Sequence, residues 1–184
     1  MPETLSTSQW IPFPVELVFA FFANPANLPH LMPPGQKARV EIARLVPAPP
    51  RPVAEDPALR FQSPTAGVGS EMVISFRPVA ALPFRQSWLA KVTEFEWNSY
   101  FCDIQLEGPF ASWSHRHGIS PETRDGVAGT FIRDDIAYTL PLGPLGAWGN
   151  ALFVRGEMEA TFAYRQKRLE EILPIAARQA IRRS

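Results

Sequence analysis

From residue 71 to residue 140, the sequence runs through one short segment after another in which apolar and polar side chains alternate. Successive side chains of a β-strand point to opposite faces, so this alternation predicts strands with one buried face. Met72, Ile74 and Phe76, for example, share one face of their segment. Antiparallel sheets that are covered on one side show this pattern. The predicted strands are 71–77, 84–92, 100–107, 112–120 and 130–140, with a turn-rich linker at 121–126.

A long amphipathic segment near the C-terminal end can cover that sheet. Its apolar side chains recur every three or four residues, which is the spacing of one face of an α-helix. Asn150 is a suitable N-cap, and the helix is expected to run down to Pro174. On its buried face, Met158 and Phe162 lie one turn apart. The full stripe consists of Val154, Met158, Thr161, Phe162, Arg165, Leu169 and Ile172.

The N-terminal part of the chain predicts a strand followed by two short helices. Residues 5–13 are expected to be extended, and Pro14 suits the first turn of a helix. The apolar stripe of this helix consists of Val15, Val18, Phe19 and Phe22. Asn24-Pro25 ends the helix. The next predicted elements are a short helix at 26–31 and a strand at 37–46.

Length and charge limit the classes of protein that this chain can belong to. With 184 residues, 46% of them hydrophobic, we expect one domain spanning residues 1–184, with a proline-rich loop inserted at 47–66. The 18 basic residues balance the 18 acidic ones, so the net charge favours neither a nucleic acid partner nor an anionic membrane. A single cysteine, Cys102, excludes an internal disulfide framework and a cysteine zinc cluster.

Targeting and membrane segments are not expected. The first nine residues are polar and lack the apolar core of a signal peptide. The longest apolar run, 15–23, contains Glu16 and is too short to span a bilayer. We therefore expect a cytoplasmic protein without stable membrane insertion.

Together these elements predict an α+β fold. A curved antiparallel sheet of about six or seven strands wraps around the long C-terminal helix, and two short helices follow the first strand. One helix does not fill the whole concave face of such a sheet, so an apolar cavity is expected between them. A solid core would produce nearly the same sequence pattern.

The residues that carry the most chemistry are Trp113, His115 and His117, which share one face if residues 112–120 form a strand. Two imidazoles and an indole on one face are compatible with three kinds of site. These are a metal site, an acid–base site, and the polar edge of an apolar cavity.

A metal site needs more ligands than this strand offers. His115 and His117 supply two imidazoles, and a third ligand would have to be Asp134 or Asp103. His30 is distant in the sequence, and the chain has no further histidine. Because metal sites in proteins normally use three or four protein ligands, we expect no metal and no cofactor.

Acid–base catalysis would use His115 or His117 together with Asp134. In the predicted strand 130–140, Asp134 and Tyr138 share an apolar face, where a carboxylate is costly unless it is paired. A histidine is the natural partner, and a histidine beside a carboxylate in a dry pocket can move protons. The alternative is that such a pair only holds two strands in register.

Binding of an apolar ligand without chemistry would use large side chains on the predicted inward faces. Pockets for such ligands are mostly apolar with a few polar anchors. Ordinary core packing is the alternative for each aromatic residue. The predicted ligand-binding set is Phe76, Trp88, Trp113, His115, His117, Tyr138, Met158 and Phe162.

The strand predicted at 100–107 leaves its orientation open. Its apolar face consists of Cys102, Ile104 and Leu106, which places the other residues on the opposite face. That second set, Phe101, Asp103 and Gln105, either faces a polar part of the cavity or has a structural role, such as a dimer surface.

The order of these elements and several short motifs resemble one family. The motifs are Ile11-Pro12-Phe13-Pro14, Val18-Phe19, Asn27-Leu28, the residues from Phe101 to His117, Thr130, Asp134, Tyr138, Pro141 and Phe162-Ala163-Tyr164-Arg165. In this order they resemble the START/polyketide-cyclase (SRPBCC) superfamily, which has the helix-grip fold, and in particular its small bacterial ligand-binding members. The resemblance covers nearly the whole chain.

The resemblance implies a deep apolar pocket between the curved sheet and the C-terminal helix. Relatives carry lipids, sterols, quinones or polyketide-like molecules in such pockets, and a minority cyclise or dehydrate them. The leading hypothesis is therefore a carrier or sensor of a small hydrophobic ligand. The alternatives are a cyclase or dehydratase, and an interaction module whose polar outer strand face docks a partner protein or, in a homodimer, a second copy of this chain.

Overall fold

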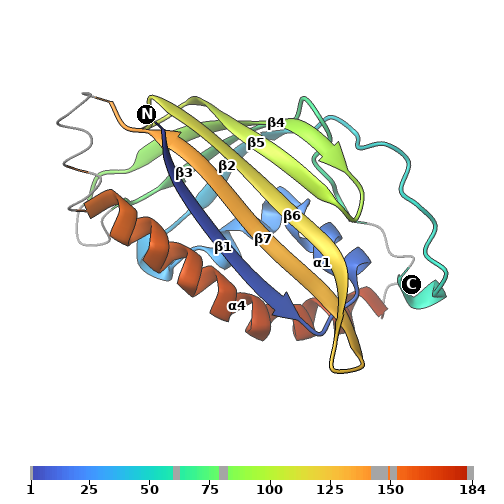
Figure 1. Ribbon diagram of the computed structural model, residues 1–184. Coiled ribbons are helices and arrows are strands. Elements are labelled where there is room, and N and C mark those ends of the chain that lie inside the picture. Colours follow the sequence, from blue (N-terminus) through green and yellow to red (C-terminus); the bar gives the residue numbers. More distant parts are fainter. Residues whose placement is uncertain (1, 60–62, 79–82, 142–148, 150–152, 182–184) are drawn as a thin grey trace.

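The structure is a computed structural model that describes residues 2–59, 63–78, 83–141, 149 and 153–181. Its centre is one curved seven-stranded antiparallel sheet with the strand order β1-β7-β6-β5-β4-β3-β2 (Figure 1). The strands are β1 (Glu3–Ile11), β2 (Arg39–Arg44), β3 (Glu71–Phe76), β4 (Gln86–Glu96), β5 (Tyr100–Glu107), β6 (Ser112–Arg124) and β7 (Val127–Thr139).

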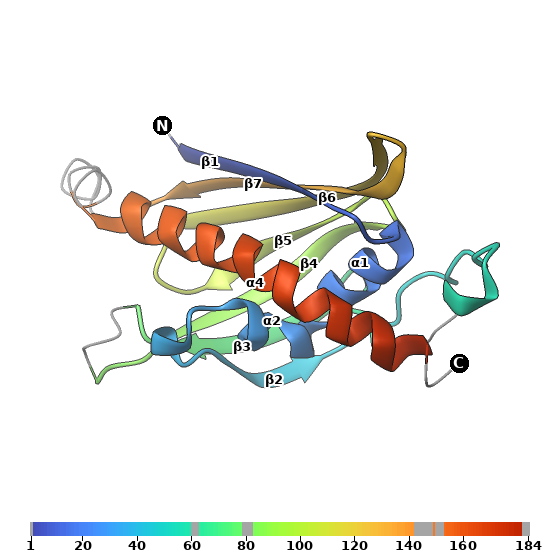
Figure 2. The ribbon, with the colours of Figure 1, turned by 90° about the horizontal axis from the view of Figure 1, so that it is seen from below.

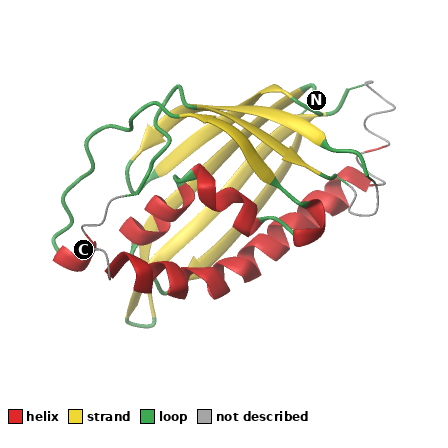
Figure 3. Cartoon of the chain, turned by 180° about the vertical axis from the view of Figure 1, so that it is seen from behind, coloured by secondary structure: helices red, strands yellow, loops and turns green. Residues whose placement is uncertain are grey.

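The helices lie on one face of the sheet. They are α1 (Val15–Phe22), α2 (Leu28–Leu31) and the long α4 (Arg155–Ile181), with short 3-10 helices η1 (Pro25–Asn27), η2 (Pro34–Gln36) and η3 (Pro57–Leu59). Figures 2 and 3 show α4 lying across the concave side of the sheet, with α1 and α2 beside it. This arrangement confirms the predicted α+β class, the two short helices after the first strand and the long terminal helix.

Helix α1 buries the stripe that its sequence predicts. Val18 and Phe19 are fully buried, and Val15 is 9% exposed. The Phe19 ring meets the rings of Phe95 and Phe101 edge to face, at centroid distances of 5.3 and 5.9 Å. Helix α1 therefore anchors one end of the core against the sheet and the C-terminal half of α4.

The predicted linker at 121–126 is wrong, because β6 continues to Arg124 and forms a tight hairpin with β7. Asp125 and Gly126 make the turn with positive φ angles of 49° and 78°, which Asp-Gly pairs adopt readily. Pro121 lies inside the strand. It is tolerated there because β5 pairs with β6 only as far as Gly118, which leaves a free edge beyond that point.

The prediction that the last helix runs only to Pro174 is also wrong. Helix α4 continues to Ile181, with Pro174 inside it. A proline in a helix interior costs about 3 kcal/mol, because it lacks an N–H and clashes with the preceding turn. Burial of Leu169 and Leu173, which are 2% and 0% exposed, holds this part of the helix on the core. Asn150, the predicted N-cap, lies outside the described residues.

The proline-rich loop packs against the end of the molecule where α1 lies. Trp97 Nε1 donates a hydrogen bond of 2.8 Å to the carbonyl oxygen of Pro49. Arg51 Nη2 donates one of 2.8 Å to the carbonyl oxygen of Glu16. In the described part of the chain, no helix is both long and apolar enough to cross a bilayer.

Candidate functional site

Strands β5, β6 and β7 bring the predicted polar residues together on the inner face of the sheet. Asp103 on β5 lies directly opposite His115 on β6, and His117 lies directly opposite Asp134 on β7. In antiparallel pairs, side chains at opposed positions share a face and lie close together. Cross-strand register thus assembles a cluster from residues on three different strands.

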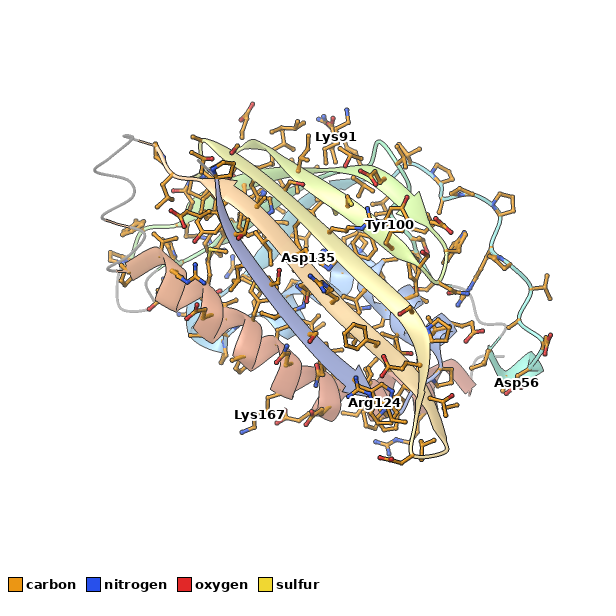
Figure 4. The ribbon with its side chains drawn as sticks, in the orientation of Figure 1. Asp56, Lys91, Tyr100, Arg124, Asp135 and Lys167 are labelled. Atoms are coloured by element: carbon orange, nitrogen blue, oxygen red, sulfur yellow. The ribbon has the colours of Figure 1, made fainter. Side chains whose placement is uncertain are left out.

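This register also answers the question of which face of β5 points inward. Phe101 is 8% exposed and stacks on the His117 ring at a centroid distance of 4.3 Å. Asp103 contacts the same imidazole, whereas Cys102 lies 3.6 Å from Arg116 on the opposite side of the sheet. Figure 4 views that outer face, on which Tyr100 and Asp135 are labelled. The set Phe101, Asp103 and Gln105 therefore belongs to the inner side.

The cluster consists of two imidazoles held between two carboxylates. At one end, Asp134 Oδ1 lies 2.9 Å from His115 Nε2 and 2.8 Å from His117 Nδ1. At the other end, Asp103 Oδ2 lies 3.3 Å from His117 Nε2 and 4.0 Å from His115 Nδ1. The two rings are 3.8 Å apart between centroids. These contacts confirm that a histidine is the partner of Asp134.

Arg165 joins the cluster from α4, and sequence reasoning did not assign it this role. Its Nη2 atom lies 3.8 Å from Asp134 Oδ1 and 3.4 Å from His117 Nδ1. The guanidinium also lies over the Phe22 ring, at 4.7 Å from the centroid. The available signal was an arginine within the apolar stripe of a helix, where only a paired charge is stable.

Electrostatics separates the protonation states of the two histidines. Burial lowers the pKa of His117, but hydrogen bonds to Asp103 and Asp134 outweigh it and raise that pKa above its usual value. Burial, together with repulsion from His117, lowers the pKa of His115. His117 therefore binds a proton more readily, and His115 stays neutral more easily.

Asp134 is ionised in this setting. Burial by itself raises the pKa of its carboxyl group, but Arg165 and hydrogen bonds from the two imidazoles hold that pKa well below its usual value. The carboxylate therefore carries a negative charge next to a guanidinium in the interior. A buried charge arranged in this way is stable only while its partners remain.

An aromatic cluster adjoins the histidines on the same inner face. The Trp113 ring lies 4.7 Å from Trp88, 5.0 Å from Phe110 and 6.2 Å from Tyr138 between centroids. It also meets His115 edge to face at 6.0 Å. We call this group the aromatic cluster; its members are Trp88, Phe110, Trp113 and Tyr138.

The remaining predicted ligand-binding residues surround the aromatic cluster. Phe162 on α4 meets the His115 ring at 5.6 Å, and Phe76 lies 6.2 Å from Trp88. Met158 is half-buried and packs against the same group. Phe110 was missed, because it follows Gly108-Pro109 outside any strand and has no periodic pattern around it. Ligand binding by these residues stays a prediction.

Comparisons with known proteins found matches only at the level of structure. Protein-family models and curated proteins produced no match to the sequence. TTHA0849 from Thermus thermophilus has a TM-score of 0.61 at 21% identity, covering 95% of this chain and 99% of that one. Ara h 8.0201 has a TM-score of 0.59 at 13% identity, covering 94% and 98%.

A START superfamily protein from Mycobacterium smegmatis matches with a TM-score of 0.60 at 13% identity, covering 93% of this chain and 97% of that one. The chain therefore shares its fold, the helix-grip fold, with these three proteins. In this helix-grip fold, the His/Asp cluster, which consists of Asp103, His115, His117 and Asp134, and the aromatic cluster both lie on the face of the sheet that α4 covers.

Two tryptophans of the helix-grip interior have hydrogen-bond donors without a partner. The Nε1 atoms of Trp88 and Trp113 are buried and make no hydrogen bond within the described structure. Two tryptophans elsewhere are satisfied: Trp10 Nε1 donates to the carbonyl oxygen of Glu122 at 3.0 Å, and Trp97 donates to that of Pro49. A buried donor that lacks an acceptor costs about 1–3 kcal/mol.

A surface depression lies elsewhere, beside the proline-rich loop. It is lined by Glu16, Pro52, Val53, Ala54, Glu55, Asp56, Leu59 and Asn98. None of the predicted site residues lines it, so it is separate from both inner clusters.

Proposed function

We propose that this protein binds a small, largely apolar molecule against the aromatic cluster, between the sheet and α4, as a carrier or sensor. The observation that supports this best is the pair of buried indole N–H groups of Trp88 and Trp113 without an acceptor. A bound molecule with an acceptor atom at this position would remove the free-energy cost of both. The surrounding rings supply apolar contact area for the rest of the molecule.

The unpaired donors narrow the chemical class of the ligand. Tryptophan can only donate a hydrogen bond, so the matching group on the ligand is an acceptor such as a carbonyl, phenolic or ether oxygen. Quinones, polyketides and other oxygenated aromatic molecules combine such atoms with an apolar body. A plain hydrocarbon chain would leave both donors unsatisfied. Among hydrophobic molecules, we therefore favour oxygenated aromatic ones over saturated lipids.

The direct test is organic extraction of the purified protein followed by mass spectrometry, together with titration of an oxygenated aromatic probe such as a naphthoquinone. Quenching of tryptophan fluorescence reports binding. Met158→Trp replaces a flexible thioether with a bulky ring against the aromatic cluster, whereas Glu159→Trp adds the same ring on the exposed side of α4.

We expect the wild-type protein and Glu159→Trp to bind the probe and Met158→Trp to lose at least tenfold in affinity. Equal affinity of the two variants would contradict binding at this place. Failure of the wild-type protein to bind any such molecule would remove the proposal.

A second candidate function is proton transfer in a cyclisation or dehydration, carried out by His115 or His117 with Asp134. The observation that favours it is the opposite shift of the two histidine pKa values, since such separated pairs mark acid and base roles. His115→Ala and His117→Ala should then abolish turnover of a bound polyketide-like substrate and leave its affinity nearly unchanged. Equal loss of affinity and turnover would indicate binding alone.

Self-association is the third hypothesis. Exposed apolar side chains occur on β2 and β5, for example Ile42 and Leu106, which are 49% and 45% exposed. Light scattering over a range of concentrations will show whether the chain forms a dimer. A monomer at all concentrations would exclude this role.

A further inference from the structure

Three electron-pair donors converge at the end of the His/Asp cluster that faces Asp103. One oxygen of Asp103, one nitrogen of His115 and one nitrogen of His117 all lie within 4.8 Å of one another. We propose that Asp103, His115 and His117 bind one divalent transition-metal ion of the zinc or iron class. This departs from the expectation drawn from the sequence, which counted only two ligands on the histidine strand.

The positions of the ring protons support this assignment. Asp134 Oδ1 lies within hydrogen-bonding distance of His115 Nε2 and of His117 Nδ1, at 2.9 and 2.8 Å, so it accepts the N–H groups at that end. When both rings are neutral, the opposite nitrogens, His115 Nδ1 and His117 Nε2, present lone pairs toward an Asp103 oxygen, which is also an acceptor. Three acceptors that face one another can share one cation, which is either a proton on His117 Nε2 or, in our proposal, a metal ion.

Arg165 does not provide that cation. Its Nη2 atom approaches Asp134 Oδ1 and His117 Nδ1, at the opposite end of the cluster from Asp103. Its contact with His117 Nδ1 is 3.4 Å long, whereas Asp134 reaches the same nitrogen at 2.8 Å. The guanidinium therefore neutralises Asp134 and leaves the Asp103 end available to a metal ion.

Asp134 contacts the nitrogen of each histidine that faces away from the proposed metal ion. Histidines that bind metals in proteins almost always donate their second N–H to a carboxylate or carbonyl, which fixes the ring and its tautomer. Here one carboxylate oxygen holds both rings. This arrangement is independent of the ligand distances and orients both free nitrogens toward Asp103.

The distances suit a first-row transition metal. In a tetrahedral site with bonds of about 2.1 Å, neighbouring ligand atoms lie about 3.4 Å apart. The Asp103–His117 distance of 3.3 Å matches this value, whereas the Asp103–His115 distance of 4.0 Å, in a set whose atoms lie within 4.8 Å of one another, requires the side chains to move inward on binding. Two imidazoles with one carboxylate favour zinc or iron(II), whereas calcium and magnesium prefer oxygen ligands alone.

Such a site would keep coordination positions open toward a bound molecule. Three protein ligands are typical of metal sites that also bind water or a substrate. The Asp103 side chain is 17% exposed, so an ion has access to it. Trp113 and Phe162 contact the His115 ring, which places the aromatic cluster next to the ion.

The test is metal binding by the full chain after removal of bound ions with a chelator. Titration with zinc is followed by calorimetry, and titration with cobalt(II) is followed by visible absorption, which reports the coordination geometry. We expect one ion per chain. Asp103→Asn and His117→Gln should each lose more than tenfold in affinity, and Asp134→Asn should lose about 10–100-fold.

Matched controls are Asp135→Asn on the outer side of β7, labelled in Figure 4, and His30→Gln on α2. Both should bind zinc as the wild-type protein does. Absence of saturable one-to-one binding, or unchanged affinity in Asp103→Asn and His117→Gln, would overturn the proposal. Asp103→Asn keeps its shape at a partly exposed position, so it remains informative if the histidine variants do not fold.

Discussion

Two neighbouring regions on the inner face of the sheet differ in whether their buried polar atoms have partners within the chain. In the His/Asp cluster, Asp134 accepts from two imidazoles and faces a guanidinium, so its buried charge is compensated within the chain. In the aromatic cluster, two buried indole N–H groups have no acceptor. A compensated cluster can be stable on its own, whereas an unpaired buried donor suggests a partner from outside the chain. We therefore expect substitutions in the His/Asp cluster to affect stability and substitutions in the aromatic cluster to affect ligand binding.

Removal of Asp134 should produce the largest effect on stability. Asp134→Ala leaves Arg165 and the adjacent imidazoles buried without their carboxylate, and losses from breaking buried ion pairs in this way are about 3–5 kcal/mol. Asp135→Ala, one position along on the outer face, removes an exposed pair with Arg133 and should cost about 1 kcal/mol or less. Urea unfolding of both variants measures the difference. Similar losses in both would mean that the cluster does not hold its charges as described.

Removal of an unpaired indole N–H should affect ligand binding more than folding. Trp113→Phe keeps an aromatic ring and deletes a donor, so affinity for an oxygenated aromatic probe should fall about tenfold, which corresponds to about 1.4 kcal/mol. Trp97→Phe deletes a donor that Pro49 already satisfies, and should leave affinity unchanged. Fluorescence titration of a shared probe compares them. Equal affinity of the two variants for the probe would show that the aromatic cluster does not bind it.

The smallest expected effect is a difference in the sign of pH dependence, measured with chelator present. In His115→Gln, His117 remains, and its raised pKa contributes stability that is present below the unfolded value of 6.5 and is lost as pH rises through the folded value. In His117→Gln, the repulsion from His117 is gone, and burial, which is the largest cause, still acts to lower the pKa of the remaining His115. The unfolded state then takes up the proton first, and stability is lost as pH falls through 6.5.

Unfolding free energies at pH 5.5 and pH 8 test this contrast. We expect His115→Gln to be more stable at the lower pH and His117→Gln at the higher pH. The same sign in both variants would show that the two imidazoles do not occupy different environments.

Local patterns predicted most of the fold because they depend on neighbouring residues. Trp113, His115 and His117 alternate on one strand, so their shared face follows from strand geometry alone, and all three are buried. The stripe of α1 was equally clear. The turn at Asp125-Gly126 was placed too broadly, because Pro121 suggests a break and only the free edge of β6 makes that proline acceptable.

The site was harder to predict because it joins distant elements. In β5, apolar residues occur on both sides: Phe101 on the inner face and Cys102 on the outer one, so periodicity could not orient Asp103. Its orientation was decided by pairing with β6. Arg165 reaches Asp134 only through the way α4 lies across the sheet.

The amino-acid sequence by itself determined the strands, the helices and which side chains share a face, because these follow from periods of two and 3.6 residues within one segment. The tertiary structure decided the partners across segments: that Asp103 meets His117, that one oxygen of Asp134 holds two rings, and that Arg165 neutralises it. These contacts depend on strand register and on helix placement, which result from the packing of the whole core and are not encoded in any single segment.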